Sequence, residues 1–237
     1  MPVCAQVDMW NDHWCKSDVT RIREIGGPMN NTLTAARALG IHIIFAPSDV
    51  TTYYSAAAVR LRTLSLPNAT LPPRKPKYAK PPAFPLGTAT DGSCDDGKSK
   101  SGSPWTHQTD ALHIDQSRDF LIAADLPGDS MAGEQELWNV VRKEKIQNLI
   151  YMGVHENMCV MERPFAIEQV ASWGWPAERM AVMRELVDVS YNPSDFPYVS
   201  HAEGLALHTA FIEKFWASSV SMYDLLVPEY HGDHEEM

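Results

Sequence analysis

The chain has 237 residues, of which 44% are hydrophobic and 21% charged, and its formal net charge is −10. We expect residues 1–237 to form a single α/β domain with an insertion, since this length can bury a sizeable core. The excess of acidic residues argues against nucleic acid or an anionic membrane surface as the main partner. No apolar run approaches the ~20 residues of a membrane span. No signal peptide precedes the first strand-like segment, so we expect a cytoplasmic protein.

The first elements alternate between strand and helix patterns. Residues 3–9 are largely apolar, with the acid Asp8 near their end, and predict a buried strand. We expect a helix over about 28–39, because Pro28 suits a first helical position and Gly40 suits a C-terminal stop. The short, β-branched segment 41–46 predicts a second strand. This order favours a parallel strand–helix–strand unit.

The middle of the chain is rich in proline. Eight of the seventeen prolines fall between Pro67 and Pro104. We interpret residues 67–110 as an irregular insertion without a core of its own. A surface loop is the first interpretation, and a lid over a site is the alternative.

Regular patterns return after the insertion. Strands are expected over 120–124, 148–154 and 180–189, and a helix over 131–144 with Ser130 as its N-cap. Ser200 and Glu203 form a capping box at the start of another helix. The whole pattern predicts a three-layer α/β/α fold with a mostly parallel, Rossmann-like sheet of about six strands.

Cys159 differs from the other three cysteines of the chain. No two cysteines form a CxxC pair, and we expect no disulfide framework in a chain of this size. Cys159 follows the strand 148–154, where a helical pattern begins. A helix N-terminus lowers a thiol pKa and offers N–H groups to an oxyanion. We therefore predict an accessible thiol of low pKa at Cys159.

Two segments resemble motifs of the isochorismatase-like cysteine hydrolases, a superfamily that includes nicotinamidases and N-carbamoylsarcosine amidohydrolase. Residues 153–160 read Gly-Val-His-Glu-Asn-Met-Cys-Val, similar to the family's Gly-Val-x-Thr-Asn-x-Cys-Val, with Glu156 in place of threonine. Residues 8–12 read Asp-Met-Trp-Asn-Asp and resemble the family's Asp-Met-Gln-Asn-Asp. Two such motifs in the right order are more specific than either alone.

The resemblance implies roles for particular residues. Cys159 would be the nucleophile and Asp8 the general base that takes its proton. The N–H groups of His155 and Cys159 would form the oxyanion hole beside a cis Val154–His155 peptide bond. The pocket candidates are Trp10, Glu156, Asn157 and Arg118. We also expect Pro164 to interrupt the helix after Cys159.

The family's catalytic lysine has no counterpart in the corresponding segment, residues 120–129. If the protein is a hydrolase, we expect Arg118 or a lysine of the insertion to supply a cation beside Asp8 and Cys159. The family's Asp-x-His metal motif is also missing, so we expect no metal and no other cofactor. Asp12, His13 and His42 are a weak alternative set of metal ligands.

These observations favour a cysteine hydrolase that acts on a small amide, carbamoyl or related C–N bond of a small-molecule substrate. The alternative is a non-catalytic binding or assembly module on the same fold, because the triad is incomplete. Vinyl-ether hydrolysis of the isochorismatase type is a third, weaker option. A homo-oligomer is compatible with each of them.

Overall fold

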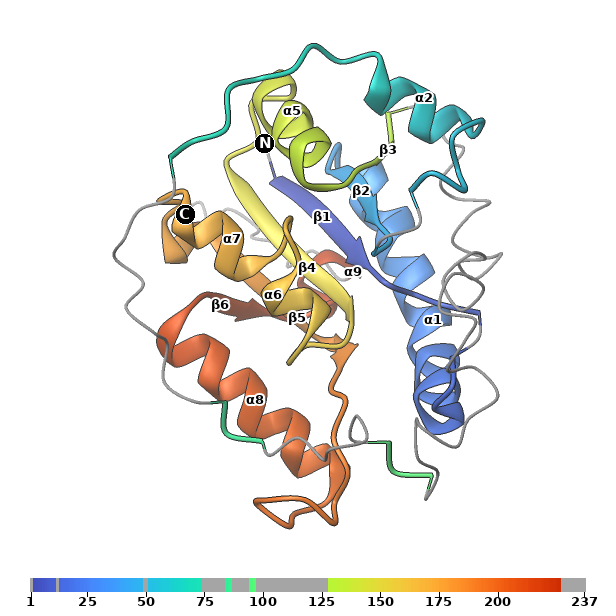
Figure 1. The fold of residues 1–237 in the computed structure, drawn as a ribbon, viewed down its shortest axis with the longest axis vertical. Helices are drawn as coiled ribbons and strands as arrows, with labels where there is room; N and C mark the ends of the chain where they lie inside the picture. The colour runs from blue at the N-terminus through green and yellow to red at the C-terminus, as the bar shows by residue number, and fades with distance from the viewer. Residues whose placement is uncertain are drawn as a thin grey trace, which may run out of the picture.

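The core of the fold is a parallel six-stranded sheet in the order β3-β2-β1-β4-β5-β6 (Figure 1). The computed structural model describes residues 2–11, 13–48, 51–73, 84–86, 94–96 and 128–226. Its strands are β1 (Pro2–Val7), β2 (His42–Ala46), β3 (Ser130–Met131), β4 (Asn148–Val154), β5 (Met180–Asp188) and β6 (Ser218–Val220). All five strand pairings are parallel. The predicted three-layer α/β/α class is confirmed.

Helices cover both faces of this sheet. They are α1 (Lys16–Ala38), α2 (Ala58–Leu64), α5 (Glu134–Lys143), α6 (Cys159–Glu162), α7 (Ile167–Ser172), α8 (His201–Phe215) and α9 (Tyr223–Leu226), with a short 3-10 helix, η3 (Ala177–Arg179). In Figure 1, α5, α6, α7 and α8 lie on the near face, while α1 and α9 lie behind the sheet. The two faces therefore have separate cores.

Alternation along β1 shows how the central strand serves both cores. Val3, Ala5 and Val7 belong to the core beneath α5, α7 and α8, whereas Cys4 belongs to the core beneath α1. Successive side chains of a strand point to opposite faces, so a continuous apolar run is needed when both faces are covered. This is why residues 3–9 lack the polar alternation of a surface strand.

Helix α1 is longer than predicted. It begins at Lys16, and Pro28 lies inside it rather than at its first position. Proline removes one helical hydrogen bond, which favours a helix start there when local signals alone are considered. Packing against the sheet outweighs that local cost along one face of the helix. The buried residues that make this contact include Ile22, Met29, Leu33 and Ala36.

The helix predicted over 131–144 begins later than expected. Ser130 is not its N-cap, because Ser130 and Met131 pair with β2 as the short strand β3. Helix α5 starts at Glu134, and the N–H of Gly133 donates to the Glu136 carboxylate at 2.9 Å. Pairing with β2 satisfies the backbone of Ser130 in a way that no local pattern reveals.

Several other predictions are confirmed. Strand β4 has the predicted bounds, β5 lies within its predicted range, and Ser200 caps α8 with Glu203. Pro164 separates α6 from α7, and Arg163 before it is extended, as expected for a residue preceding proline. The strand predicted over 120–124 lies outside the described residues.

Parts of the proline-rich insertion contact the domain. The N–H of Ala69 donates to Asn139 Oδ1 at 2.9 Å, and Trp138 Nε1 donates to the carbonyl of Thr70 at 2.8 Å. Cys94 forms a disulfide with Cys15 at the start of α1. The expectation of no disulfide is therefore wrong for these two cysteines. They are 79 positions apart, so no local pattern indicates that they meet.

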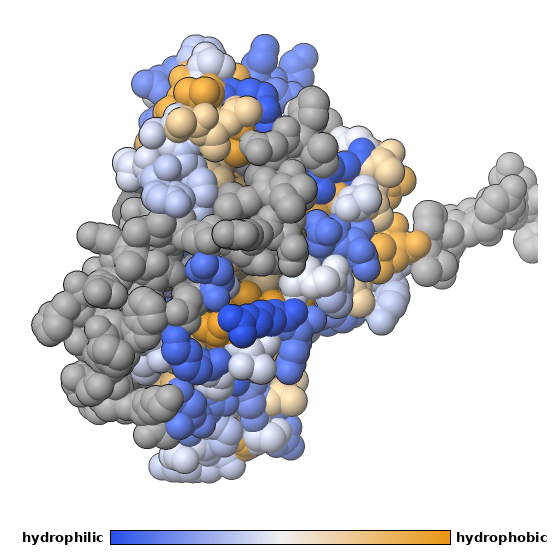
Figure 2. All heavy atoms as spheres, turned by 90° about the vertical axis from the view of Figure 1, so that its right-hand side faces the viewer, coloured by the Kyte–Doolittle hydropathy of each residue, from blue (hydrophilic) through white to orange (hydrophobic). Residues whose placement is uncertain are grey.

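None of the helices over the described ranges combines the length and the apolar character needed to cross a bilayer. On the face drawn in Figure 2, hydrophilic residues separate small hydrophobic areas.

Candidate active site

Asp8 lies at the carboxyl end of the central strand, as predicted. It follows β1 directly, is fully buried and has a positive φ of 47°. The N–H of Ser48, just beyond β2, donates to Asp8 Oδ1 at 2.6 Å, and the Ser48 hydroxyl donates to Oδ2. Because β1 and β2 are parallel neighbours, their carboxyl ends meet at one edge of the sheet, where open α/β folds bind ligands. These two donors hold the carboxylate in place.

Cys159 is brought to the same edge by β4, the other neighbour of β1. It is the first residue of α6, and its thiol lies close enough to the Asp8 carboxylate for that group to raise its pKa. The structure therefore brings together the two residues that the resemblance paired, although they are 151 positions apart in sequence. Only 8% of Cys159 is exposed.

The protonation of Cys159 differs from the prediction. Burial raises its pKa to about 12, and the nearby Asp8 carboxylate adds to the rise, while Arg163 opposes it. The prediction of an accessible thiol of low pKa at Cys159 is therefore wrong. The helix that starts at Cys159 has only four residues, so its dipole offers little compensation for burial and a neighbouring negative charge.

Arg163 is a functional candidate that the sequence analysis missed. Its guanidinium lies near the Cys159 thiol and lowers the pKa of that thiol, against the effect of burial. Arg163 follows Cys159 by four positions, a spacing that places side chains on one side of a helical turn, so the signal was present. Arg118 and the lysines of the insertion, which were expected to supply the cation, lie outside the described residues.

The loop from β4 to α6 is held by backbone hydrogen bonds. The Val154–His155 peptide bond is cis. The N–H groups of Met158 and Val160 donate to the carbonyl of His155, and the N–H of Glu156 donates to that of Asp188. Among the described residues, these bonds use neither the N–H of His155 nor that of Cys159. Those two groups are the ones that the resemblance assigns to an oxyanion.

The side chains of Glu156 and Asn157 are engaged by the protein. Glu156 accepts hydrogen bonds from His208 Nδ1 at 3.1 Å and from the Thr209 hydroxyl at 3.0 Å, both on α8. Burial raises the pKa of Glu156, and His208 opposes that rise. Asn157 exchanges two hydrogen bonds of 2.9 Å with the backbone of Ser190. These contacts make both residues anchors of the loop rather than groups open to a substrate.

Trp10 contacts the loop between β4 and α6 through His155. It is buried, stacks on His13 with ring centroids 4.3 Å apart, and meets His155 edge-on at 5.2 Å. Trp10 therefore contacts both His155 of the loop and His13, which lies just before α1.

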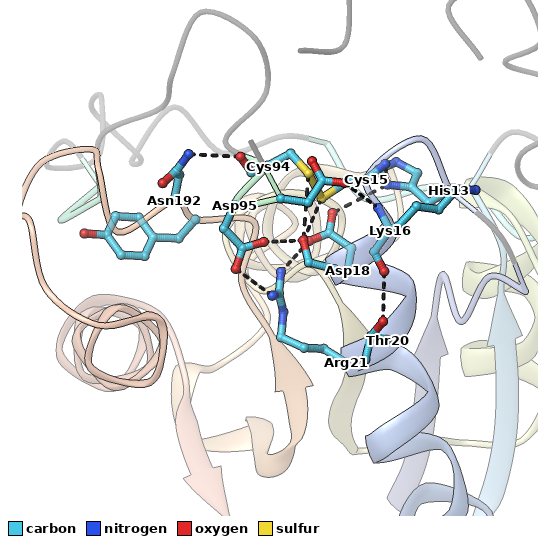
Figure 3. Close-up of a disulfide and its surroundings, with 12 residues drawn as sticks. His13, Cys15, Lys16, Asp18, Thr20, Arg21, Cys94, Asp95 and Asn192 are labelled. Atoms are coloured by element: carbon cyan, nitrogen blue, oxygen red, sulfur yellow. Dashed lines mark hydrogen bonds and ion pairs between the residues drawn. A yellow bond between two sulfur atoms is a disulfide. The ribbon is translucent and has the colours of Figure 1, made fainter. Parts of the chain in front are cut away.

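A second group of ionisable residues lies next to His13 and His155. Arg21 on α1 pairs with Asp18 at 2.6 Å, and with Asp95 and Asp188 at 2.8 Å each. Figure 3 shows Asp18, Arg21 and Asp95 converging next to the Cys15–Cys94 disulfide. His201 Nε2 lies 2.8 Å from Asp188 Oδ1. No sequence pattern predicted this group, because its members come from α1, the insertion, the end of β5 and the start of α8.

These contacts shift several pKa values. Burial opposes ionisation of Asp18, but His155, His13 and Arg21 outweigh it and hold its pKa well below its usual range. The pKa of Asp188 is lowered in the same way, against burial, by His201, His155 and Arg21. Burial alone would lower the pKa of His201, yet Asp188 raises it.

The weak metal set of the sequence analysis is not assembled. His13 lies near Asp18, at 3.5 Å, while His42 at the start of β2 hydrogen-bonds Ser130. Asp12 lies outside the described residues. Another set, Asp18, His155 and Asp188, does place its candidate ligand atoms within 4.8 Å of one another.

Comparisons with known proteins reveal similarity in structure. No protein-family model and no curated protein matches the sequence. A cysteine hydrolase from Pseudomonas syringae pv. phaseolicola 1448A is 14% identical, with 95% of this chain and 90% of that chain covered and a TM-score of 0.51. At this identity the likeness is one of fold, and it agrees with the fold that the two sequence motifs predicted.

Two further solved structures are similar at lower scores. The N-carbamoylsarcosine amidase from Thermoplasma acidophilum is 12% identical, covers 93% of this chain and 96% of its own, and has a TM-score of 0.45. The nicotinamidase/pyrazinamidase from Bacillus subtilis is 13% identical, covers 92% and 98%, and has a TM-score of 0.47.

Proposed function

We propose that this chain, which has the fold of the isochorismatase-like cysteine hydrolases, cleaves a small amide, carbamoyl or related C–N bond through Cys159. The observation that carries the proposal is that one thiol lies near both a carboxylate, Asp8, and a guanidinium, Arg163, which shift its pKa in opposite directions. A base and a cation at one sulfur are the two groups that a buried nucleophilic thiol needs.

The raised thiol pKa defines how this site would start the reaction. At neutral pH Cys159 keeps its proton, so no thiolate lies beside Asp8 before the reaction begins. The repulsion expected between a thiolate and a carboxylate, about 4 kcal/mol at 4 Å and an effective dielectric of 20, is thereby avoided. The proton would pass from sulfur to Asp8 only as the sulfur attacks the carbonyl carbon of the substrate.

The remaining steps follow from the same groups. The tetrahedral oxyanion would accept hydrogen bonds from the N–H groups of His155 and Cys159. Asp8 would return its proton to the leaving amine or ammonia as the C–N bond breaks and a thioester forms. Water, giving a proton to Asp8, would then attack the thioester, and the proton would return to the Cys159 sulfur as the acid leaves. Arg163 would stabilise the sulfur whenever it is negative.

The alternative, a non-catalytic module on the same fold, is favoured by one observation. Cys159 is 92% buried and its pKa is raised, which is also typical of an inert thiol. The two functions differ in what Asp8 does, so a substitution there separates them.

The test measures hydrolysis and thiol alkylation on the same variants. Turnover is assayed against a panel of small amides and N-carbamoyl compounds, and iodoacetamide labelling of Cys159 is followed by peptide mass spectrometry. We expect Cys159→Ala to abolish turnover. Asp8→Asn should lower turnover by about 100- to 10,000-fold, because the general base is lost. The same variant should speed alkylation at pH 8, because removing the negative charge lowers the thiol pKa.

Substitutions of Arg163 should have the opposite effect on alkylation. Arg163→Leu should slow alkylation and turnover together, since the thiolate loses its cation, and Arg163→Lys should restore part of both. Cys4→Ala is the labelling control, because Cys4 is fully buried in β1. Folded protein with no turnover on any substrate of the panel above the Cys159→Ala background would leave the non-catalytic module as the better account.

The compartment belongs to this proposal as well. The sequence pattern at the start of the chain led us to expect a cytoplasmic location. The Cys15–Cys94 bond favours an oxidising environment instead, because structural disulfides are rare where thiols are kept reduced.

A further inference from the structure

Three ionisable side chains from distant parts of the chain meet beside the loop that carries Cys159. Asp18 belongs to the first turn of α1, His155 follows β4, and Asp188 ends β5. Their candidate ligand atoms all lie within 4.8 Å of one another, and all three residues are buried. This group is separate from the pair of Asp8 and Cys159.

One candidate ligand atom of this group, Nε2 of His155, makes no hydrogen bond with the described residues. This atom is buried. It lies 3.4 Å from Asp18 Oδ2, and His13 Nδ1 lies 3.5 Å from the same oxygen. Arg21 binds the other oxygen of Asp18, Oδ1, at 2.6 Å. Oδ2 of Asp18 and Nε2 of His155 therefore face one another with neither engaged by the guanidinium.

The charges around Arg21 do not balance when the histidines are neutral. One guanidinium faces three carboxylates, those of Asp18, Asp95 and Asp188, which leaves two negative charges in excess. Buried charge without compensation costs several kcal/mol. A single divalent cation would bring the group to neutrality, whereas two protonated histidines would otherwise be needed.

We propose that Asp18, His155 and Asp188 bind one divalent transition-metal ion. The ligand atoms would be Asp18 Oδ2, His155 Nε2 and a carboxylate oxygen of Asp188. Imidazole nitrogen and carboxylate oxygen are donors that Zn²⁺ and Mn²⁺ accept. Arg21 and His201 would keep their contacts with the two carboxylates and orient them, as outer partners of metal ligands do.

A nearby group of similar composition offers no equivalent site. Cys15, Cys94 and Asp95 also lie within ligand distance of one another. The two sulfurs are joined in a disulfide, so neither is a thiolate that could bind a metal.

The test is metal binding by the full, disulfide-intact chain after chelator treatment. Mn²⁺ is used first, because thiolates such as those of Cys4 and Cys159 are poor ligands for it, and Zn²⁺ second. Calorimetry should give one ion per chain, and the ion should raise the thermal midpoint. Asp18→Asn and His155→Gln should each weaken binding at least ~10-fold. His42→Gln, which alters a histidine at the opposite end of the sheet, should bind as the wild type does.

Two further measurements decide between outcomes. Near-ultraviolet circular dichroism checks that each variant is folded. If Asp18→Asn does not fold, the binding measured with His155→Gln decides the test. The double variant His231→Gln/His234→Gln removes the histidines near the C-terminus and should retain binding. No stoichiometric binding by the wild type, or a loss confined to the double variant, would overturn the proposal. Hydrolysis is not measured, so the proposed function stands or falls separately.

Discussion

Gly153 lets the two central strands approach closely enough for Asp8 to meet Cys159. It pairs with Val7 between β1 and β4 and has a positive φ of 111°. A Cβ atom at this position would lie 1.9 Å from the carbonyl oxygen of Val7, the residue before Asp8. Glycine alone combines this backbone conformation with the absence of a side chain. The close packing of β1 and β4 thus requires glycine at this position of the motif, independently of any reaction.

We predict that Gly153→Ala destabilises the fold by at least ~3 kcal/mol, because a backbone atom cannot move aside as a side-chain end can. Chemical denaturation followed by circular dichroism measures the change. Gly27→Ala is the matched control: Gly27 lies inside α1, and a Cβ there meets no atom within 4 Å. The control should gain up to about 1 kcal/mol from helix propensity. Equal stability of the two variants would refute this account of Gly153.

The loop that carries Cys159 is attached to α8 through Glu156. Glu156 and His208 are both fully buried, and Thr209 supplies a third member of the group. Glu156 stands where the family motif has threonine, and its longer side chain reaches the helix behind the loop. The glutamate at this motif position therefore has hydrogen-bond partners on α8, which the sequence pattern did not reveal.

Glu156→Ala should cost about 3–5 kcal/mol of unfolding free energy, since it leaves His208 and Thr209 buried without their acceptor. Glu156→Gln keeps an acceptor oxygen and should cost less than half of that loss. Denaturant midpoints at constant pH measure both. Glu178→Ala, at an exposed position in η3, should change stability by less than about 0.5 kcal/mol. A glutamine variant as unstable as the alanine variant would contradict the hydrogen-bond argument.

The insertion is joined to the domain by a covalent bond as well as by polar contacts. Cys94 is bonded to Cys15, its carbonyl accepts from Asn192 at 2.9 Å, and Asp95 accepts from the Ser17 hydroxyl (Figure 3). The segment 94–96 thus bridges the start of α1 and the chain beyond β5. These two regions flank the candidate site.

We predict that the denatured, unreduced chain exposes two reactive thiols from its four cysteines. Removing the bond with Cys15→Ser/Cys94→Ser should destabilise the protein by up to about 4.5 kcal/mol, the loop-closure entropy for a separation of 79 residues. A reductant should lower the stability of the wild type but not of the double variant. Four reactive thiols in the wild type would show that the bond does not form.

Local sequence patterns were sufficient for the central strands and the two motifs. The apolar runs of β1, β2, β4 and β5 are continuous because both faces of a parallel sheet are covered. Such runs can be recognised in the sequence alone. The capping box at Ser200 and the break at Pro164 were equally legible, because each depends on residues within four positions. The start of α1 and the strand at Ser130 were not, because packing on the sheet decided them.

What the sequence alone determined is the fold class, and with it the expectation that Asp8 and Cys159 lie at one edge of the sheet. Tertiary structure decided the protonation of Cys159, because burial and the neighbouring Asp8 raise its thiol pKa, and no sequence motif reveals burial. It also decided the Cys15–Cys94 bond and the meeting of Asp18, His155 and Asp188. Residues from the two ends of the chain become neighbours only when parallel strands bring their carboxyl ends together.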